Sequence, residues 1–274
     1  MKKVFNKIWK NSLFLTIGFL VSEQSLAGAW TQPQGEGIFI GRAEWYVSTR
    51  SYDKEGDLFV SPRHRELKIN PYVEYGITDN FTIGTNIFYL DITNTPGKGA
   101  SDFGDIEVFG RYRLWEKEYS VLSVQGLFKY PGPASGFAVP NNGDRQVDIE
   151  GNILFGTGGR LSTVHDDFWF LDTRLGYRKR FNGPADEIRA DALAGFKMNE
   201  QKTWWMVKSE NIIGMHNPSP NGNPPNYDLY TIEPSVLYWI RPIVGLQAGI
   251  RYDYFGRNVG VGTAPFVAVW VNFN

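Results

Sequence analysis

The residues able to carry out nucleophilic or acid–base chemistry are few and poorly placed for it. The chain has no cysteine and only three histidines, His64, His165 and His216. Hydrolysis by a serine nucleophile needs a base within hydrogen-bonding reach of the hydroxyl group. No histidine lies two residues before a serine, the spacing that would put both on one strand face. The sequence therefore predicts no enzymatic activity and gives no ligand set for a cofactor.

Charged residues instead recur at alternate positions. In the run 103–114, Asp105, Glu107, Arg111 and Arg113 are separated from one another by even numbers of positions. Alternate residues of a strand lie on one face, so these side chains are expected to lie together. The acidic pair could bind a cation. The neighbouring arginines favour internal ion pairs, so no metal site is predicted.

Similar charged faces, with both signs, occur along most of the chain. Such faces are typical of the wall of a wet interior. One interpretation is a solvated, ion-paired wall that stiffens the fold, and the other is a polar pathway for a solute; both can hold. The candidate lumen-lining residues are Arg42, Glu44, Lys68, Glu74, Asp105, Glu107, Arg111, Arg113, Asp148, Glu150, Asp172, Arg174, Arg178, Arg189, Asp191, Lys208, Glu210, Arg251 and Asp253.

These faces require strands to position them. Apolar and polar residues alternate with period two, and no run of eighteen apolar residues suggests a transmembrane helix after residue 29. About twelve strand-like segments can be read. They are 37–51, 64–77, 81–93, 103–115, 119–131, 145–159, 167–181, 187–199, 203–216, 227–240, 244–256 and 263–273.

The connections between these segments alternate in length. Short turns at 78–80, 116–118, 199–202 and 241–242 alternate with longer connections rich in Gly, Pro and Asn. The longer connections are 53–63, 94–102, 132–144 and 217–226. Short periplasmic turns and long outer loops are typical of transmembrane barrels, and an even strand count puts both termini on one side.

A soluble β-sandwich also alternates, but two features favour a membrane barrel. The polar faces carry dense charge, and aromatic residues fall near strand ends as in an interfacial girdle. The girdle candidates are Trp45, Tyr46, Trp115, Trp169, Trp204, Trp205, Tyr230, Tyr238, Trp239, Tyr252 and Tyr254. The predicted fold is all-β, a transmembrane antiparallel up-and-down β-barrel of about 12 strands, with ten or fourteen as the alternatives.

Residues 1–29 have the features of a signal peptide. Lysines at positions 2, 3, 7 and 10 precede an apolar run at 12–21, which is too short to span a bilayer. An A-x-A pattern follows at Ala27-Gly28-Ala29. We expect cleavage before Trp30, or alternatively after Ala27, leaving residues 30–274 as the barrel; an N-terminal anchor helix is the other interpretation. The expected location is the outer membrane of a Gram-negative bacterium.

One internal segment carries a family resemblance. The run 103–114, FGDIEVFGRYRL, resembles a G-D-[IVL]-E-x-x-x-[RK]-Y-R-L segment, and 28–37 resembles the opening of the same family. The family consists of outer-membrane barrels labelled "MetA-pathway of phenol degradation" or outer-membrane transporter. The resemblance implies passage of small, often hydrophobic or aromatic, compounds and implies no catalytic residues.

The last segment, 264–274, is similar to the C-terminal signal read by the barrel-assembly machinery, although Asn274 follows the terminal aromatic Phe273. The expected partners are therefore that machinery, outer-membrane lipid and lipopolysaccharide, and a small-molecule solute. A formal net charge of -1 gives no indication of nucleic-acid binding. The predicted function is a channel or transporter for passive uptake of small molecules. The alternative is a non-transporting structural or surface-interaction protein.

Overall fold

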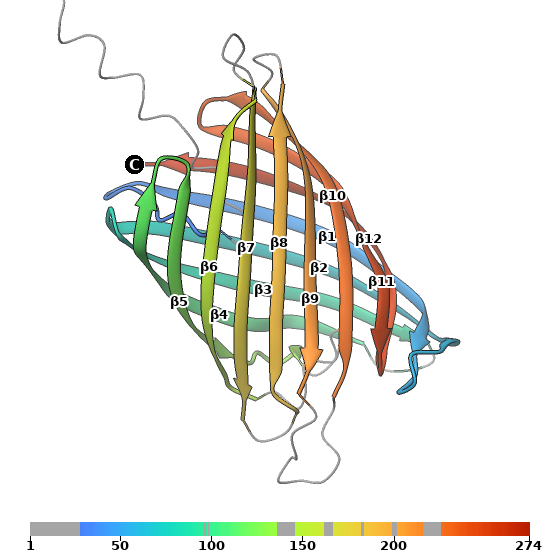
Figure 1. The fold of residues 1–274 in the computed structure, drawn as a ribbon. Coiled ribbons are helices and arrows are strands. Elements are labelled where there is room, and N and C mark those ends of the chain that lie inside the picture. The colour runs from blue at the N-terminus through green and yellow to red at the C-terminus, as the bar shows by residue number, and fades with distance from the viewer. Residues whose placement is uncertain are drawn as a thin grey trace, which may run out of the picture.

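The protein is a single closed β-barrel (Figure 1). The computed structural model describes residues 28–95, 97, 99–135, 146–161, 167–181, 184–198, 202–215 and 226–274. The strands are β1 (Gly37–Tyr52), β2 (Leu58–Thr78), β3 (Phe81–Thr95), β4 (Ala100–Lys117), β5 (Ser120–Tyr130), β6 (Asp148–Arg160), β7 (Phe168–Arg180), β8 (Glu187–Lys197), β9 (Thr203–Gly214), β10 (Asp228–Arg241), β11 (Val244–Arg257) and β12 (Val259–Phe273). No helix among the described residues is long and apolar enough to cross a membrane.

The strand order confirms the predicted topology. Each strand pairs antiparallel with its neighbours in sequence, and β1 closes the barrel on β12, with Gly37 opposite Phe273. Closure leaves no free sheet edge. The start of β1 and the end of β12 lie on one side, which we call the terminal end, and the turn between β1 and β2 lies at the opposite end, which we call the loop end (Figure 1).

The outer surface of the barrel is apolar. Large hydrophobic side chains such as Ile153, Leu175 and Val267 are 58%, 59% and 50% exposed. Their neighbours in sequence turn inward, as the burial pattern of β5 shows by strict alternation. Soluble monomers rarely expose an apolar surface of this extent, and it forms the lipid-facing band of a membrane barrel.

Several strands are longer at the loop end than the sequence indicated. Residues 58–63 were expected in a connection, but β2 begins at Leu58, which pairs with Tyr52. The run Leu58-Phe59-Val60 favours a strand, and the turn needs only residues 53–57. There the Asp53 carboxylate accepts the backbone N–H groups of Glu55 and Asp57, and Gly56 supplies a φ of 88°.

Three aromatic residues assigned to the girdle lie elsewhere. Tyr46, Trp204 and Trp239 are 3%, 2% and 8% exposed and point into the barrel, whereas Trp205 is 51% exposed on the outer surface. Adjacent residues of a strand face opposite sides, so Trp204 and Trp205 cannot both belong to a lipid-facing girdle. Trp204 and Trp239 both belong to the apolar cluster that fills part of the lumen.

Candidate functional site

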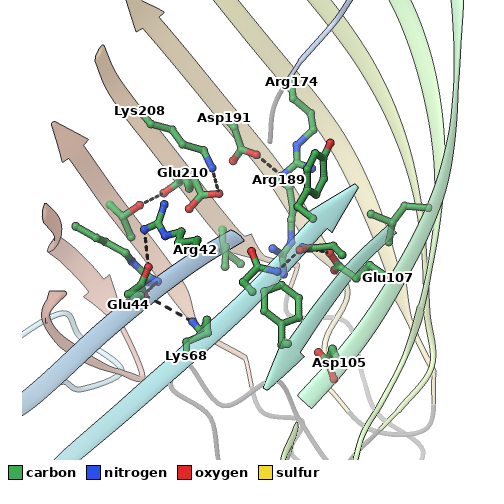
Figure 2. A pocket seen from close by; sticks show the side chains of 18 of the residues that line it. Arg42, Glu44, Lys68, Asp105, Glu107, Arg174, Arg189, Asp191, Lys208 and Glu210 are labelled. Carbon is green, nitrogen blue, oxygen red and sulfur yellow. Dashed lines mark hydrogen bonds and ion pairs between the residues drawn. The ribbon is translucent and has the colours of Figure 1, made fainter. Parts of the chain in front are cut away.

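The lumen holds a charged cavity, which we call the chamber. The cavity has a volume of about 220 Å³. Tyr72, Phe109 and Leu127 form part of its wall and also belong to an apolar cluster beneath it. Its charged lining consists of Arg42, Glu44, Lys68, Asp105, Glu107, Arg174, Arg178, Arg189, Asp191, Lys208, Glu210 and Arg251. Figure 2 shows ten of these side chains converging from strands on several sides of the barrel.

Glu44 on β1 is the centre of one group of ion pairs. Its carboxylate lies 2.5 Å from Arg42, 3.5 Å from Arg251 and 3.8 Å from Lys68. Arg42 also reaches Glu233 on β10 at 2.7 Å, across β12 and β11. Burial of these groups is tolerable because each charge is paired and hydrogen-bonded. The group therefore ties together strands that do not pair directly.

Glu150 on β6 is the centre of a second group. It is 1% exposed and lies 2.5 Å from Arg178, 3.7 Å from Arg174 and 3.9 Å from Arg189. Arg178 also donates to Glu107 on β4 at 3.0 Å, across β6 and β5. The three arginines thus share one buried carboxylate.

The remaining predicted chamber residues pair with near neighbours. Arg174 is ion-paired with Asp191 on β8, and Lys208 lies 2.7 Å from Glu210 on β9. These pairs are drawn as dashed lines in Figure 2. Asp253 lies outside the cavity lining, where it bonds to Arg251 at 3.1 Å.

Several interior charges are absent from the predicted set. Lys129 on β5 is 2% exposed and lies 3.1 Å from Asp105 and 2.9 Å from Asp148. Glu187 likewise joins Arg180, at 2.6 Å, to Arg189. Each lies an even number of positions from a side chain that points inward, as Lys129 does from Gln125 and Leu127. This spacing could have identified both residues as interior, although Lys129 is the one charged residue on its face of β5.

The lumen below the chamber is filled by apolar side chains, which we call the floor. Its members include Phe170 on β7, Trp204 and Met206 on β9, Trp239 on β10 and Trp270 on β12. Phe170 and Trp204 have ring centroids 5.4 Å apart. The chamber is charged, whereas this sector of the terminal end is apolar, so the expectation of a polar wall throughout the lumen is wrong for this sector.

Four predicted lumen residues lie at the terminal end, outside the chamber. Glu74 and Arg111 form a buried ion pair at 2.6 Å, with exposed fractions of 0% and 1%. Asp172 is also buried and accepts the backbone N–H of Ala29. Arg113 lies nearer the rim, where its guanidinium donates to the Asn80 side chain at 2.6 Å.

The described residues contain no cluster of His, Cys, Asp or Glu that could hold a metal ion. His64 bonds to Asn94 at 2.6 Å through Nδ1 and packs edge-on against Tyr46. His165 and His216 lie outside the described residues. Ser48 on β1 lies opposite His64, but its hydroxyl donates to the carbonyls of Arg50 and Val261, at 2.9 and 2.8 Å.

A closed twelve-stranded barrel with an apolar outer surface and a charged interior has the architecture of outer-membrane β-barrels. The chain is similar to the COG4313 outer membrane channel from Pseudomonas putida F1, with a TM-score of 0.71 and 11% identity over 92% of this chain and 100% of that one. It is also similar to the NanC porin, with a TM-score of 0.53 and 9% identity over 85% and 98% of the two chains. At these identities the likeness shows the fold alone. No protein-family model matches the chain, and no curated protein matches it.

Proposed function

We propose that the protein is an outer-membrane channel through which small molecules pass passively. The observation that supports this most is the chamber, a charged cavity inside a barrel whose outer surface is apolar. In a bilayer, polar groups are tolerated where they line a wet interior. A wall of ion pairs that only stiffened the barrel would not need to surround an open volume.

The chamber wall suggests the kind of solute. Exposed parts of Arg189 and Lys68, with side chains 18% and 20% exposed, can donate hydrogen bonds to a polar or anionic group. Phe88, Leu90 and Ile212 line the same cavity and offer apolar contact. We therefore infer a small solute with a charged or polar group and an apolar or aromatic part.

The resemblance of residues 103–114 to the "MetA-pathway of phenol degradation" barrels is consistent with this proposal. In this chain the segment supplies Asp105 and Glu107 to the chamber wall and Arg111 to the terminal end. An aromatic compound bearing a polar substituent would satisfy both the family's expected chemistry and the chamber lining.

Replacing Arg174 by alanine is expected to change ion flow without preventing assembly. The side chain lies in the chamber wall, 12% exposed, and its loss leaves Asp191 and Glu150 with one cation fewer. The reversal potential in planar bilayers under a salt gradient should shift toward cation selectivity. Arg241→Ala, an exposed residue at the end of β10, is the matched control and should leave the reversal potential unchanged. Equal reversal potentials for the two variants would show that Arg174 does not line the permeation path.

The second candidate is a non-transporting structural or surface-interaction protein. The floor favours it, because Trp204, Trp239 and Trp270 fill part of the lumen that an open pore would keep clear. Bilayer recordings with the folded, purified chain decide between the candidates. Discrete current steps support the channel, and a folded barrel that never conducts supports the alternative.

Location and processing are testable in the same cells. The chain should fractionate with the outer membrane, and mass spectrometry of the isolated protein should find the segment 1–29, or 1–27, removed. Ala29 donates its backbone N–H to Asp172 and accepts the Ser123 hydroxyl, so a mature chain beginning at Gly28 would retain these two contacts and one beginning at Trp30 would lack them. Recovery as a soluble periplasmic protein, or with the basic segment intact, would contradict the proposal.

A further inference from the structure

Two arginines lie on the outer face of β2 near the loop end. Arg63 and Arg65 alternate with His64 and Glu66, which are buried in the interior. Both arginines are exposed, and neither guanidinium forms an ion pair or a hydrogen bond with another of the described residues. A charge on the lipid side of a barrel is costly unless an anion neutralises it. The two cations therefore favour an anionic group outside the chain as their partner.

The neighbouring strand adds two hydroxyl groups to the same surface. Thr95 on β3 pairs with Arg63, and Thr93 pairs with Arg65. Both threonines are exposed, and their hydroxyl groups form no hydrogen bond within the described part of the chain. Residues two apart on a strand are separated by about 7 Å, and paired strands by about 5 Å. These four side chains, which we call the arginine patch, therefore place their hydrogen-bond donors within reach of one phosphate group.

The arginine patch lies at the edge of the lipid-facing band. From Leu67 to Ile77 the outward residues of β2 are uncharged. The ten steps of about 3.3 Å between these two residues make about 33 Å along the strand. At a strand tilt of about 40° this length covers about 25 Å of bilayer, which is the height of the apolar band of an outer-membrane barrel. Arg65 is the next outward residue toward the loop end, so the patch lies where the lipid headgroups begin.

Apolar and aromatic side chains continue from the patch toward the middle of the barrel. Trp45 on β1 is 47% exposed and pairs with Leu67. Ile69, 43% exposed, pairs with Tyr89 on β3, which in turn pairs with Phe103 on β4, 53% exposed. The rings of Tyr89 and Phe103 pack edge to face, with centroids 5.7 Å apart. A molecule bound at the patch by a phosphate group therefore meets an apolar surface with the rest of its length.

We propose that the arginine patch binds a phosphate group of lipopolysaccharide, and that the acyl chains of this lipid lie on Trp45, Ile69 and Phe103. Guanidinium groups bind phosphate through paired, charge-assisted hydrogen bonds, and the threonine hydroxyls add two donors. Lipopolysaccharide is the lipid that combines phosphate and acyl chains in the outer leaflet, which the loop end faces. The proposal rests on the outer-membrane location with the loop end outward, and it does not depend on whether the barrel conducts.

The main test compares two double variants of the folded, purified protein. Arg63→Gln with Arg65→Gln removes the cations of the patch, and Lys117→Gln with Arg241→Gln removes two exposed cations at the terminal end. Heat-dependent gel mobility confirms folding, and native mass spectrometry measures binding of purified lipopolysaccharide. The affinity should fall about tenfold or more in the patch variant and stay at the parent value in the control. Equal affinities in the two variants would overturn the proposal.

An acid beside the patch gives a test with the opposite sign. Asp91 on β3 is exposed, lies opposite Leu67, and forms no ion pair with the described residues. Its carboxylate repels a phosphate group bound at Arg65, so Asp91→Asn should bind lipopolysaccharide more tightly than the parent. Weaker binding by Asp91→Asn would show that the carboxylate takes part through a bridging cation, and it would overturn direct binding by the arginines.

The choice of lipid identifies the group that is bound. The parent should bind dephosphorylated lipopolysaccharide about tenfold more weakly than the intact lipid, and the patch variant should not distinguish the two. Equal binding of both lipids by the parent would show that acyl contacts alone hold the lipid. Phosphatidylglycerol that binds the parent as tightly as lipopolysaccharide would show a site for any anionic lipid. Either result would overturn the proposal, and neither bears on the channel function, because no current is measured.

Discussion

Leu175→Arg is expected to block assembly of the barrel into membranes or to destabilise it strongly. Leu175 lies in the middle of β7 and is 59% exposed on the outer face, opposite Ile153 and Ala190. An arginine on the lipid face near the bilayer midplane costs about 2–4 kcal/mol. Because a strand's neighbouring residues face opposite sides, the side chain cannot turn to the lumen without shifting the whole strand.

The matched control places the same residue at the membrane boundary. Leu161, beyond the end of β6, is 57% exposed, and arginine near the interface costs only about 0–1 kcal/mol. The two variants are compared by heat-dependent gel mobility and by urea unfolding in lipid vesicles. If Leu175→Arg folds as well as Leu161→Arg, β7 does not face lipid at Leu175.

The strands, and the side of the barrel that each side chain faces, could be predicted because both depend on the alternation of neighbouring residues in the sequence. Period two fixes which residues share a face, so the facing assigned to β7, with Arg174 inward and Leu175 outward, needed no tertiary information. The same parity could have placed Trp204. It shares a face with Met206 and Lys208, and the latter was already predicted to line the lumen. The position of Trp204 near a strand end instead favoured the interfacial girdle, which is the wrong side of the strand.

The partners inside the lumen could not be predicted in the same way. Arg42 bonds to Glu233, 191 positions away, and Arg178 bonds to Glu107 across two intervening strands. Such contacts depend on the tilt and diameter of the closed barrel, which no local pattern encodes. The position of the residues before β1 could not be predicted either. Nothing in residues 28–36 alone indicates that Ala29 will meet Asp172, 143 positions later.

Among the interior residues, replacement of Lys129 is expected to lower the free energy of unfolding most. The sequence pattern did not identify this residue. It is the cation between two buried carboxylates, Asp105 at 3.1 Å and Asp148 at 2.9 Å. Among the described residues, the other cation near Asp148 is Arg178, at 3.9 Å. Removing one member of a buried ion pair leaves an uncompensated charge and costs about 3–5 kcal/mol. Lys129→Ala should therefore lower the free energy of unfolding by that amount at neutral pH.

Neutralising the two carboxylates is expected to restore the stability that Lys129→Ala removes. If the cost of Lys129→Ala comes from the stranded charges, Asp105→Asn together with Asp148→Asn should recover much of it, because neutral amides need no cation. Lys179→Ala, whose side chain is 47% exposed while paired with Asp186, is the matched control and should cost at most about 1 kcal/mol. Urea unfolding of the four proteins in vesicles measures the differences. Equal losses for the two lysines, or no recovery in the triple variant, would mean that the Lys129 ammonium does not compensate these carboxylates and that the wall around them is hydrated.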